Sequence, residues 1–247
     1  MSIIPDICSM HILLAAATTV EIQPAIDFLA SSAPPGHETS TLITGVGSIA
    51  TVWSLMHRTR SRRPDLIIQA GIAGCFAGRM NTGKVFVIGE EVLGDLGVWE
   101  DQRWKSLFDL KLADKDTPPF SNGRLVNPYK KLIALTGLET VSGMTVNEIT
   151  TARARIDWYQ HPSGPPDKQV PELPGSQVVI ESMEGGGLHY VCLQEKIPFL
   201  QLRSVSNEIG VRDKTKWDIK GAIGNLNEQL IALLKKLYTV DRTIFDG

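Results

Sequence analysis

The chain has 247 residues, 43% of them hydrophobic and 21% charged, and a formal net charge of −2 at pH 7. This length and hydrophobic content suffice for a substantial core, so we expect one domain over residues 1–247. A charge balance this close to neutral gives no reason to expect nucleic acid or an anionic membrane surface as a partner.

The N-terminal residues and the cysteines bear on the cellular compartment. Residues 1–10 contain no Lys or Arg and are expected to form a loose extension, and the apolar run at residues 12–17 is too short to span a bilayer. Cys8, Cys75 and Cys192 are far apart and lack metal-ligand spacing. We therefore expect a cytoplasmic protein with reduced thiols, without a membrane anchor, a disulfide, a structural zinc or another cofactor.

The first sixty residues contain two successive strand and helix pairs. Residues 11–17 read as a strand buried on both faces, and an amphipathic helix is predicted over residues 22–29. A second strand at residues 41–44 is followed by Gly45-Val46-Gly47 and by a helix over residues 49–60. This alternation predicts an α/β fold.

Two further strands follow, at residues 66–70 and 84–92. The first is expected to end in a glycine-containing turn, Gly71-Ile72-Ala73-Gly74. Residues 94–119 lack a sustained period and are interpreted as a long functional loop. Its aromatic side chains could cover the core or form a lid over an aromatic part of a ligand. These side chains are Trp99, Trp104 and Phe108.

The second half continues the pattern, with helices predicted at residues 129–136 and 146–155 and a strand at 140–143. Residues 161–174 carry five prolines and are expected to form a loop rather than a domain boundary, because a strand resumes at residue 178. A buried strand is predicted at residues 198–207. Asp218 is expected to cap a final helix that packs on the sheet. The apolar residues of that helix are Ile219, Ala222, Ile223, Leu226, Leu230, Leu233, Leu234 and Leu237.

The segment Met183-Glu184-Gly185-Gly186-Gly187 lies between a predicted strand and a helix-compatible segment at residues 188–195. Backbone can approach a ligand closely at glycines, and the first N–H groups of a helix are unpaired, so this position suits a polar ligand. The alternative is that Met183 belongs to the core and Glu184 is a first-turn residue favoured by the helix dipole. A second candidate, Ser206-Asn207, ends the strand at residues 198–207, where ligands bind in open α/β sheets.

These residues, in this order, resemble the nucleoside phosphorylase and nucleosidase superfamily, whose fold is a single α/β/α sandwich around a central mixed sheet. The resemblance implies ribose binding by Met183-Glu184, base recognition by Ser206-Asn207 and water activation by Glu21. Gly45-Val46-Gly47 and Gly71-Ile72-Ala73-Gly74 resemble the two glycine loops of the superfamily. The other substrate contacts that it implies are Gly47, Ile72, Ala73, Gly143, Met144, Val146 and Arg203.

Within the superfamily, the chain most resembles the futalosine hydrolase subgroup. Asp95-Leu96-Gly97, Ser206-Asn207 and Arg212-Asp213 with Trp217 carry this likeness. It implies hydrolysis of futalosine with release of hypoxanthine and dehypoxanthine futalosine, in the alternative menaquinone pathway. Because relatives of this fold commonly form homodimers, a homodimer or higher homo-oligomer is expected.

The chemistry of the reaction agrees with these assignments. Breaking an N-ribosidic bond develops positive charge on the ribose and negative charge on the departing base, so an anion is needed near the sugar and donors near the base. Glu184 could supply the first and Asn207 the second. An asparagine amide can donate to a 6-oxo group and accept from N7–H, so Asn207 predicts hypoxanthine as the base. An amide cannot act as the acid at N7, and the sequence leaves that proton donor open.

Three alternatives remain at this stage. A methylthioadenosine/S-adenosylhomocysteine nucleosidase shares most of these residues. A phosphorylase would need polar or basic groups around phosphate, whereas the second glycine segment offers Ile72 and Cys75. A purine nucleoside binding module without catalysis would not need Glu21. The group that binds the carboxyphenyl end of futalosine is also open, with four candidates: Arg103, Arg212, Trp99 and Trp104.

Overall fold

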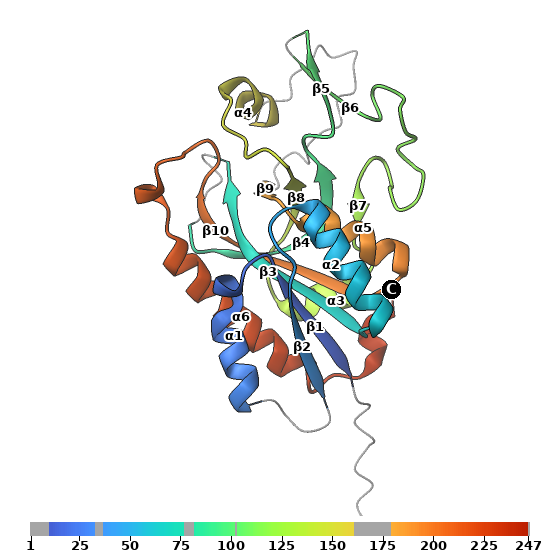
Figure 1. Ribbon diagram of the computed structural model, residues 1–247, viewed down its shortest axis with the longest axis vertical. Coiled ribbons are helices and arrows are strands. Elements are labelled where there is room, and N and C mark those ends of the chain that lie inside the picture. The colour runs from blue at the N-terminus through green and yellow to red at the C-terminus, as the bar shows by residue number, and fades with distance from the viewer. Residues whose placement is uncertain (1–9, 33–36, 77–81, 102, 161–178, 247) are drawn as a thin grey trace, which may run out of the picture.

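The computed structural model describes residues 10–32, 37–76, 82–101, 103–160 and 179–246. Its centre is a mixed sheet in the order β10-β4-β8-β9-β3-β1-β2, with β7 paired to β4 and β10 also paired to β3. The sheet therefore closes on itself from β10 round to β3, while β1 and β2 extend beyond it (Figure 1). Its strands are β1 (His11–Ala16), β2 (Glu38–Ile43), β3 (Leu66–Cys75), β4 (Val85–Leu93), β7 (Leu125–Val126), β8 (Thr140–Thr145), β9 (Val179–Ser182) and β10 (Phe199–Glu208).

Helices cover both faces of the sheet, so the predicted three-layer α/β/α arrangement is confirmed (Figure 1). One face is covered by α1 (Thr19–Ser32) and α6 (Ile219–Leu237), and the other by α2 (Ser48–Ser61) and α5 (Gly185–Glu195). Successive side chains of β1 point to opposite faces of the sheet, so this one strand packs against both helical layers. Ile12 and Leu14 pack towards α1 and α6, whereas Leu13 and Ala15 pack towards α2 and α5.

The remaining described elements are α3 (Lys130–Thr136), α4 (Arg153–Gln160), the hairpin β5 (Gly97–Glu100) and β6 (Arg103–Ser106), and two short 3-10 helices, η1 (Lys214–Lys216) and η2 (Arg242–Phe245). The hairpin lies within residues 94–119, which the sequence analysis interprets as a long loop, so that interpretation is corrected there.

Among the described residues, no helix has the length and apolar character needed to cross a membrane. Residues 1–9 and the proline-rich segment 161–174, both subjects of predictions, lie outside the described ranges.

Two predicted boundaries are wrong, and both bear on the site. Residues 71–74 do not form a turn, because β3 runs on to Cys75 between β9 and β10. The helix predicted from residue 146 begins only at Arg153. The preceding backbone N–H groups bond elsewhere: those of Asn147 and Glu148 donate to the Asp95 carboxylate, and that of Thr150 donates to Glu181. Such bonds offer the backbone an alternative to a helix.

Candidate active site

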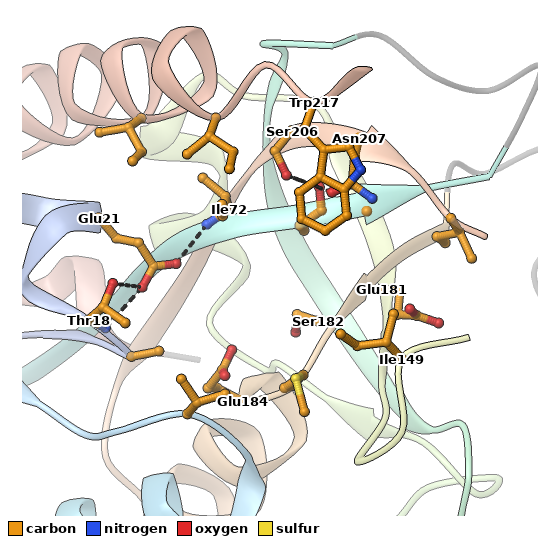
Figure 2. Close-up of a pocket in the computed structure, with 18 of the residues that line it drawn as sticks. Thr18, Glu21, Ile72, Ile149, Glu181, Ser182, Glu184, Ser206, Asn207 and Trp217 are labelled. Atoms are coloured by element: carbon orange, nitrogen blue, oxygen red, sulfur yellow. Dashed lines mark hydrogen bonds between the residues drawn. The ribbon is translucent and has the colours of Figure 1, made fainter. Parts of the chain in front are cut away.

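A cavity of about 300 Å³ opens at the carboxyl ends of β1, β3 and β10, where the sequence places its candidate residues. Glu21 and Glu184 lie on one side of the cavity, and Asn207, Trp217 and Ile149 lie on the other (Figure 2). Seven predicted site residues line it: Glu21, Ile72, Ala73, Met183, Glu184, Ser206 and Asn207. The structure thus brings together residues from four distant parts of the chain.

The other five predicted contacts do not line this cavity. Gly47 and Arg203 reach it indirectly, because both bond to the carboxylate of Glu184. Gly143, Met144 and Val146 belong to β8 or follow it directly, and all three are buried. Their roles as substrate contacts remain predictions.

Glu21 lies in the first turn of α1 with both carboxylate oxygens held by donors. Oε2 accepts from the backbone N–H of Thr18 at 3.0 Å and from the Thr18 hydroxyl at 2.9 Å. Oε1 accepts from the backbone N–H of Ile72 in β3 at 3.1 Å (Figure 2). Although the side chain is buried, it lines the cavity, so its oxygens are fixed where a water molecule could meet them.

Glu184 lies at the passage from β9 into α5 and bonds to groups from two other elements. Oε1 accepts from the backbone N–H of Gly47 at 3.1 Å, and Oε2 accepts from Nη2 of Arg203 at 3.3 Å. Gly185, Gly186 and Gly187 form the first turn of α5 instead of a loop before it, which corrects the predicted start of this helix. A Cβ on Gly185 would overlap Glu91 and Gln201, and one on Gly186 would overlap Leu93. A Cβ on Gly187 would lie in tight contact with Ser48 and Thr51.

Arg203 is fully buried in β10 and forms an ion pair with Glu184. Its Nη2 donates to Gln69 Oε1 at 3.1 Å as well as to Glu184. A Cβ on Gly71 would overlap Arg203 Nη1 and lie 2.9 Å from Glu21 Oε1. Glycine at position 71 therefore leaves room for both the Arg203 guanidinium and the Glu21 carboxylate, a packing reason rather than the predicted turn.

Asn207 has part of its hydrogen-bonding capacity already in use. Its Oδ1 lies 2.8 Å from the Ser206 hydroxyl, and its Nδ2 donates to the backbone oxygen of Glu208 at 3.0 Å. An amide carries two N–H groups and two carbonyl lone pairs, so one of each remains for a ligand. The Glu208 backbone oxygen can only accept, so this contact favours one orientation of the amide.

Trp217 and Arg212 line the cavity near Asn207. The indole N–H of Trp217 donates to the backbone oxygen of Val211 at 2.8 Å, and the guanidinium of Arg212 lies 5.3 Å from the indole ring centre. The other three candidates for the carboxyphenyl end are Arg103, Trp99 and Trp104, which belong to the β5–β6 hairpin, and none of them lines the cavity. Ile219 and Ile223, predicted as core residues of α6, also face the cavity.

Glu91, which sequence reasoning missed, is buried in β4 behind the first turn of α5. It accepts hydrogen bonds from Gln201 Nε2 and the Thr145 hydroxyl, both at 2.9 Å, and that hydroxyl accepts from the N–H of Gly186 at 2.6 Å. Burial raises the pKa of Glu91 to about 7, although Gln201, Thr145 and Arg203 act against the rise. A carboxyl group in a buried strand is a signal that could have identified it, since such a group needs partners.

The raised pKa of Glu91 predicts a stability that falls as the pH rises from about 4.5 to 7. In that window the folded chain keeps a proton that the unfolded chain has released, so the free energy of unfolding decreases with pH. The loss is on the order of 3 kcal/mol. Glu91→Gln, which cannot titrate, should remove this part of the pH dependence in denaturant titrations at pH 4.5 and pH 7.5. The exposed control Glu228→Gln should behave as the parent does. A Glu91→Gln variant with the parental pH dependence would mean that Glu91 is ionised in the folded chain.

No group of three or more His, Cys, Asp or Glu side chains suited to hold a metal ion occurs among the residues that the structure describes. Cys75 and Cys192 are both buried, and Cys8 lies outside the described ranges.

The chain matches no family model, but it is similar over most of its length to known proteins. It is 29% identical to the futalosine hydrolase of Streptomyces coelicolor over 240 residues, which cover 89% of this chain and 93% of that protein. It is 30% identical to the futalosine hydrolase of Acidothermus cellulolyticus over 194 residues, or 78% and 73% of the two chains.

Two solved structures from Helicobacter pylori share the fold. The futalosine hydrolase aligns with a TM-score of 0.71 and 13% identity, covering 92% of this chain and 98% of that one. The 5′-methylthioadenosine/S-adenosylhomocysteine nucleosidase aligns with a TM-score of 0.72 and 14% identity, covering 92% and 99%. The fold of the chain is therefore the one that these nucleosidases adopt.

Fold, cavity and relatives together define an N-glycosyl hydrolase of the nucleosidase class. The identity to the A. cellulolyticus protein extends over most of both chains. The chain belongs to the futalosine hydrolase family.

Proposed function

We propose that the chain hydrolyses the N-ribosidic bond of futalosine and releases hypoxanthine and dehypoxanthine futalosine. The observation that carries this proposal is the arrangement of the cavity in Figure 2. Two carboxylates, Glu21 and Glu184, lie on one side, and the Asn207 amide lies on the other. Membership of the futalosine hydrolase family supports the choice of substrate.

In the proposed reaction, the ribose lies against Met183 and Glu184. The C1′–N9 bond breaks with its electron pair remaining on the purine, and the cationic character that develops on the sugar is stabilised by the Glu184 carboxylate. A water molecule beside Glu21 forms the new bond to C1′ and transfers a proton to that carboxylate. Arg203 holds Glu184 through the bond at 3.3 Å, so it is a positioning residue in this scheme.

The purine lies at the Asn207 end of the cavity. The remaining N–H of Asn207 donates to the 6-oxo group, and the remaining lone pair of its carbonyl accepts from N7–H once N7 has gained a proton. An amide does not supply that proton, so it reaches N7 from water. Ile149 and Trp217 provide apolar surface for the ring on the same side of the cavity.

The hydrogen bonds that already occupy the first glycine loop, Gly45-Val46-Gly47, favour hydrolysis over phosphorolysis. A phosphate bound there would use backbone N–H groups, but the N–H of Gly47 donates to Glu184, and the Ser48 hydroxyl donates to the backbone oxygen of Met183 at 3.0 Å. Ile72, in β3, brings an apolar side chain to the cavity. Water is the acceptor that fits this arrangement.

The purified chain should therefore release hypoxanthine from futalosine at a rate that phosphate does not change. The measurement is chromatography of the products formed with and without added phosphate, and methylthioadenosine and inosine serve as comparison substrates. A rate that climbs with phosphate, together with a sugar 1-phosphate product, would contradict the hydrolase proposal. Faster cleavage of methylthioadenosine than of futalosine would contradict the proposed substrate.

The proposal extends to assembly and cellular role. Ile49 and Trp53, on the outer face of α2, are 83% and 72% exposed, and Val46 beside them lines the cavity. Exposed apolar side chains next to a cavity support a homodimer in which a second copy covers this face. We place the chain in the cytoplasm, at the futalosine step of the alternative menaquinone pathway.

A further inference from the structure

Asp95, two residues after the end of β4, has no role in the proposed reaction. One oxygen of its carboxylate accepts from the backbone N–H groups of both Asn147 and Glu148, and the other accepts from the side-chain amide of Asn147 at 3.2 Å. The neighbouring Gly94 is itself held, because its N–H donates to the backbone oxygen of Thr145 at 2.8 Å. Hydrogen bonds to a charged group are strong, so the Asp95 carboxylate fixes the path of the segment that follows β8.

A second carboxylate holds the same segment further along. Glu181, in β9, is buried, and its Oε1 accepts from the backbone N–H of Thr150 at 3.2 Å. At the start of the segment, the N–H of Val146 donates to the backbone oxygen of Ser182 at 3.0 Å. Residues 146–150 are therefore tied at both ends to β9 and in between to the Asp95 carboxylate.

Ile149 lies between the two carboxylate contacts and lines the cavity on the side of Asn207 (Figure 2). Its side chain is 38% exposed, whereas Val146 and Thr150 are buried. The backbone on both sides of Ile149 is thus fixed, while the side chain itself is left partly exposed at the cavity. An apolar side chain presented in this way offers surface that a bound ring can cover.

We propose that Asp95, together with Glu181, is a positioning residue that holds residues 147–150 so that Ile149 packs against the purine of the bound nucleoside. This inference rests on the proposed function, in which Ile149 provides apolar surface for that ring. Neither carboxylate touches the substrate in this scheme, because each acts through the backbone N–H groups that it binds. When the segment moves, Ile149 separates from the ring and the contact between them is lost.

Asp95→Ala removes the acceptor of the two N–H groups and should raise KM for futalosine on the order of 10-fold. The value of kcat should change little, because the contact with the ring is made both before and during bond breakage. Asp95→Asn keeps one oxygen for both N–H groups and should restore most of the affinity. The control Glu148→Ala removes an exposed carboxylate of the held segment and keeps its backbone, so it should retain the parental KM. A parental KM in Asp95→Ala, or a loss confined to kcat, would overturn the inference.

A double-mutant cycle separates the positioning of Ile149 from a general effect on stability. Ile149→Ala alone should raise KM on the order of 10-fold. Adding Asp95→Ala to it should raise KM by no more than about 2-fold, because the side chain that Asp95 positions is already gone. Thermal denaturation of each variant shows that it is folded. Full additivity of the two changes would mean that Asp95 does not act through Ile149.

The part played by Glu181 has its own test. Glu181→Gln loses the charge but keeps a carbonyl oxygen for the N–H of Thr150, so it should retain the parental KM. A raised KM in this variant would mean that its role is not to hold Thr150. The parent must also hydrolyse futalosine, and failure there contradicts the proposed function. Normal hydrolysis by the parent with a KM that Asp95→Ala leaves unchanged contradicts only the positioning role.

Discussion

Glu21→Gln should lower kcat for futalosine by on the order of 10²–10⁴, the usual contribution of a positioned general base. Glutamine keeps the size of the side chain, and its carbonyl oxygen can still accept from Ile72 or Thr18, but it cannot take a proton from water. The three donors that hold the Glu21 carboxylate at 2.9 to 3.1 Å fix its position, so the loss should appear in kcat more than in KM.

The measurement has two controls: thermal denaturation of Glu21→Gln, which shows that the variant is folded, and a matched variant in the same helix. Asp27→Asn removes an exposed carboxylate from the same helix, one that accepts a hydrogen bond from Gln23, and should retain parental kcat. A folded Glu21→Gln variant with near-parental turnover would make Glu21 a structural residue. The binding-module alternative would then need to be tested again.

Asn207→Asp should shift the chain from 6-oxopurine towards 6-aminopurine nucleosides. An aspartate carboxylate accepts from a 6-amino group, whereas the asparagine N–H₂ sets donor against donor there. Sites built around a hydrogen bond to the substrate can discriminate by as much as 10⁴–10⁵, and solvent access reduces that figure. The change should therefore be the largest of the specificity effects predicted for this chain.

The measurement is kcat/KM for futalosine and aminodeoxyfutalosine in the parent and in Asn207→Asp. Ser206, whose hydroxyl lies 2.8 Å from Asn207 Oδ1, can still donate to the aspartate, whereas the hydrogen bond to the Glu208 backbone oxygen is lost, so thermal denaturation of the variant accompanies the measurement. If the ratio of the two values does not move, base choice depends on other residues, and the argument for hypoxanthine from Asn207 fails.

The fold could be predicted where local pattern and tertiary structure agree. The buried strand β1 and the capped helix α6 are confirmed: all six β1 residues are buried, and Asp218 accepts from the N–H of Gly221 at 2.8 Å. Prediction failed where distant segments decide the conformation. Residues 71–74 stay extended because β9 and β10 pair with them on either side, and no local pattern reveals strands that lie more than 100 residues away.

The same distinction applies to the site. Glu21, Glu184 and Asn207 could be placed because each lies at the end of a predicted strand or just after one, and the structure brings them to one cavity. The sequence marks Glu91 and Glu181 only as carboxyl groups within strand-like runs, which says that they need partners but not which ones. Their significance comes from partners on other strands and loops: Gln201 and Thr145 for Glu91, and Thr150 for Glu181. Burial and unpaired atoms become visible only in three dimensions.

The glycine turn at the start of α5 also has a consequence for the order of folding. Its three residues pack against segments near positions 48, 91, 145 and 201, which are separated by most of the length of the chain. Contacts so distant in sequence carry a large entropic cost and form slowly. The turn that carries Glu184 can therefore dock only after these segments have assembled. The position of Glu184 thus depends on contacts with all of these segments, and a chain in which one of them is out of place has Glu184 out of place as well.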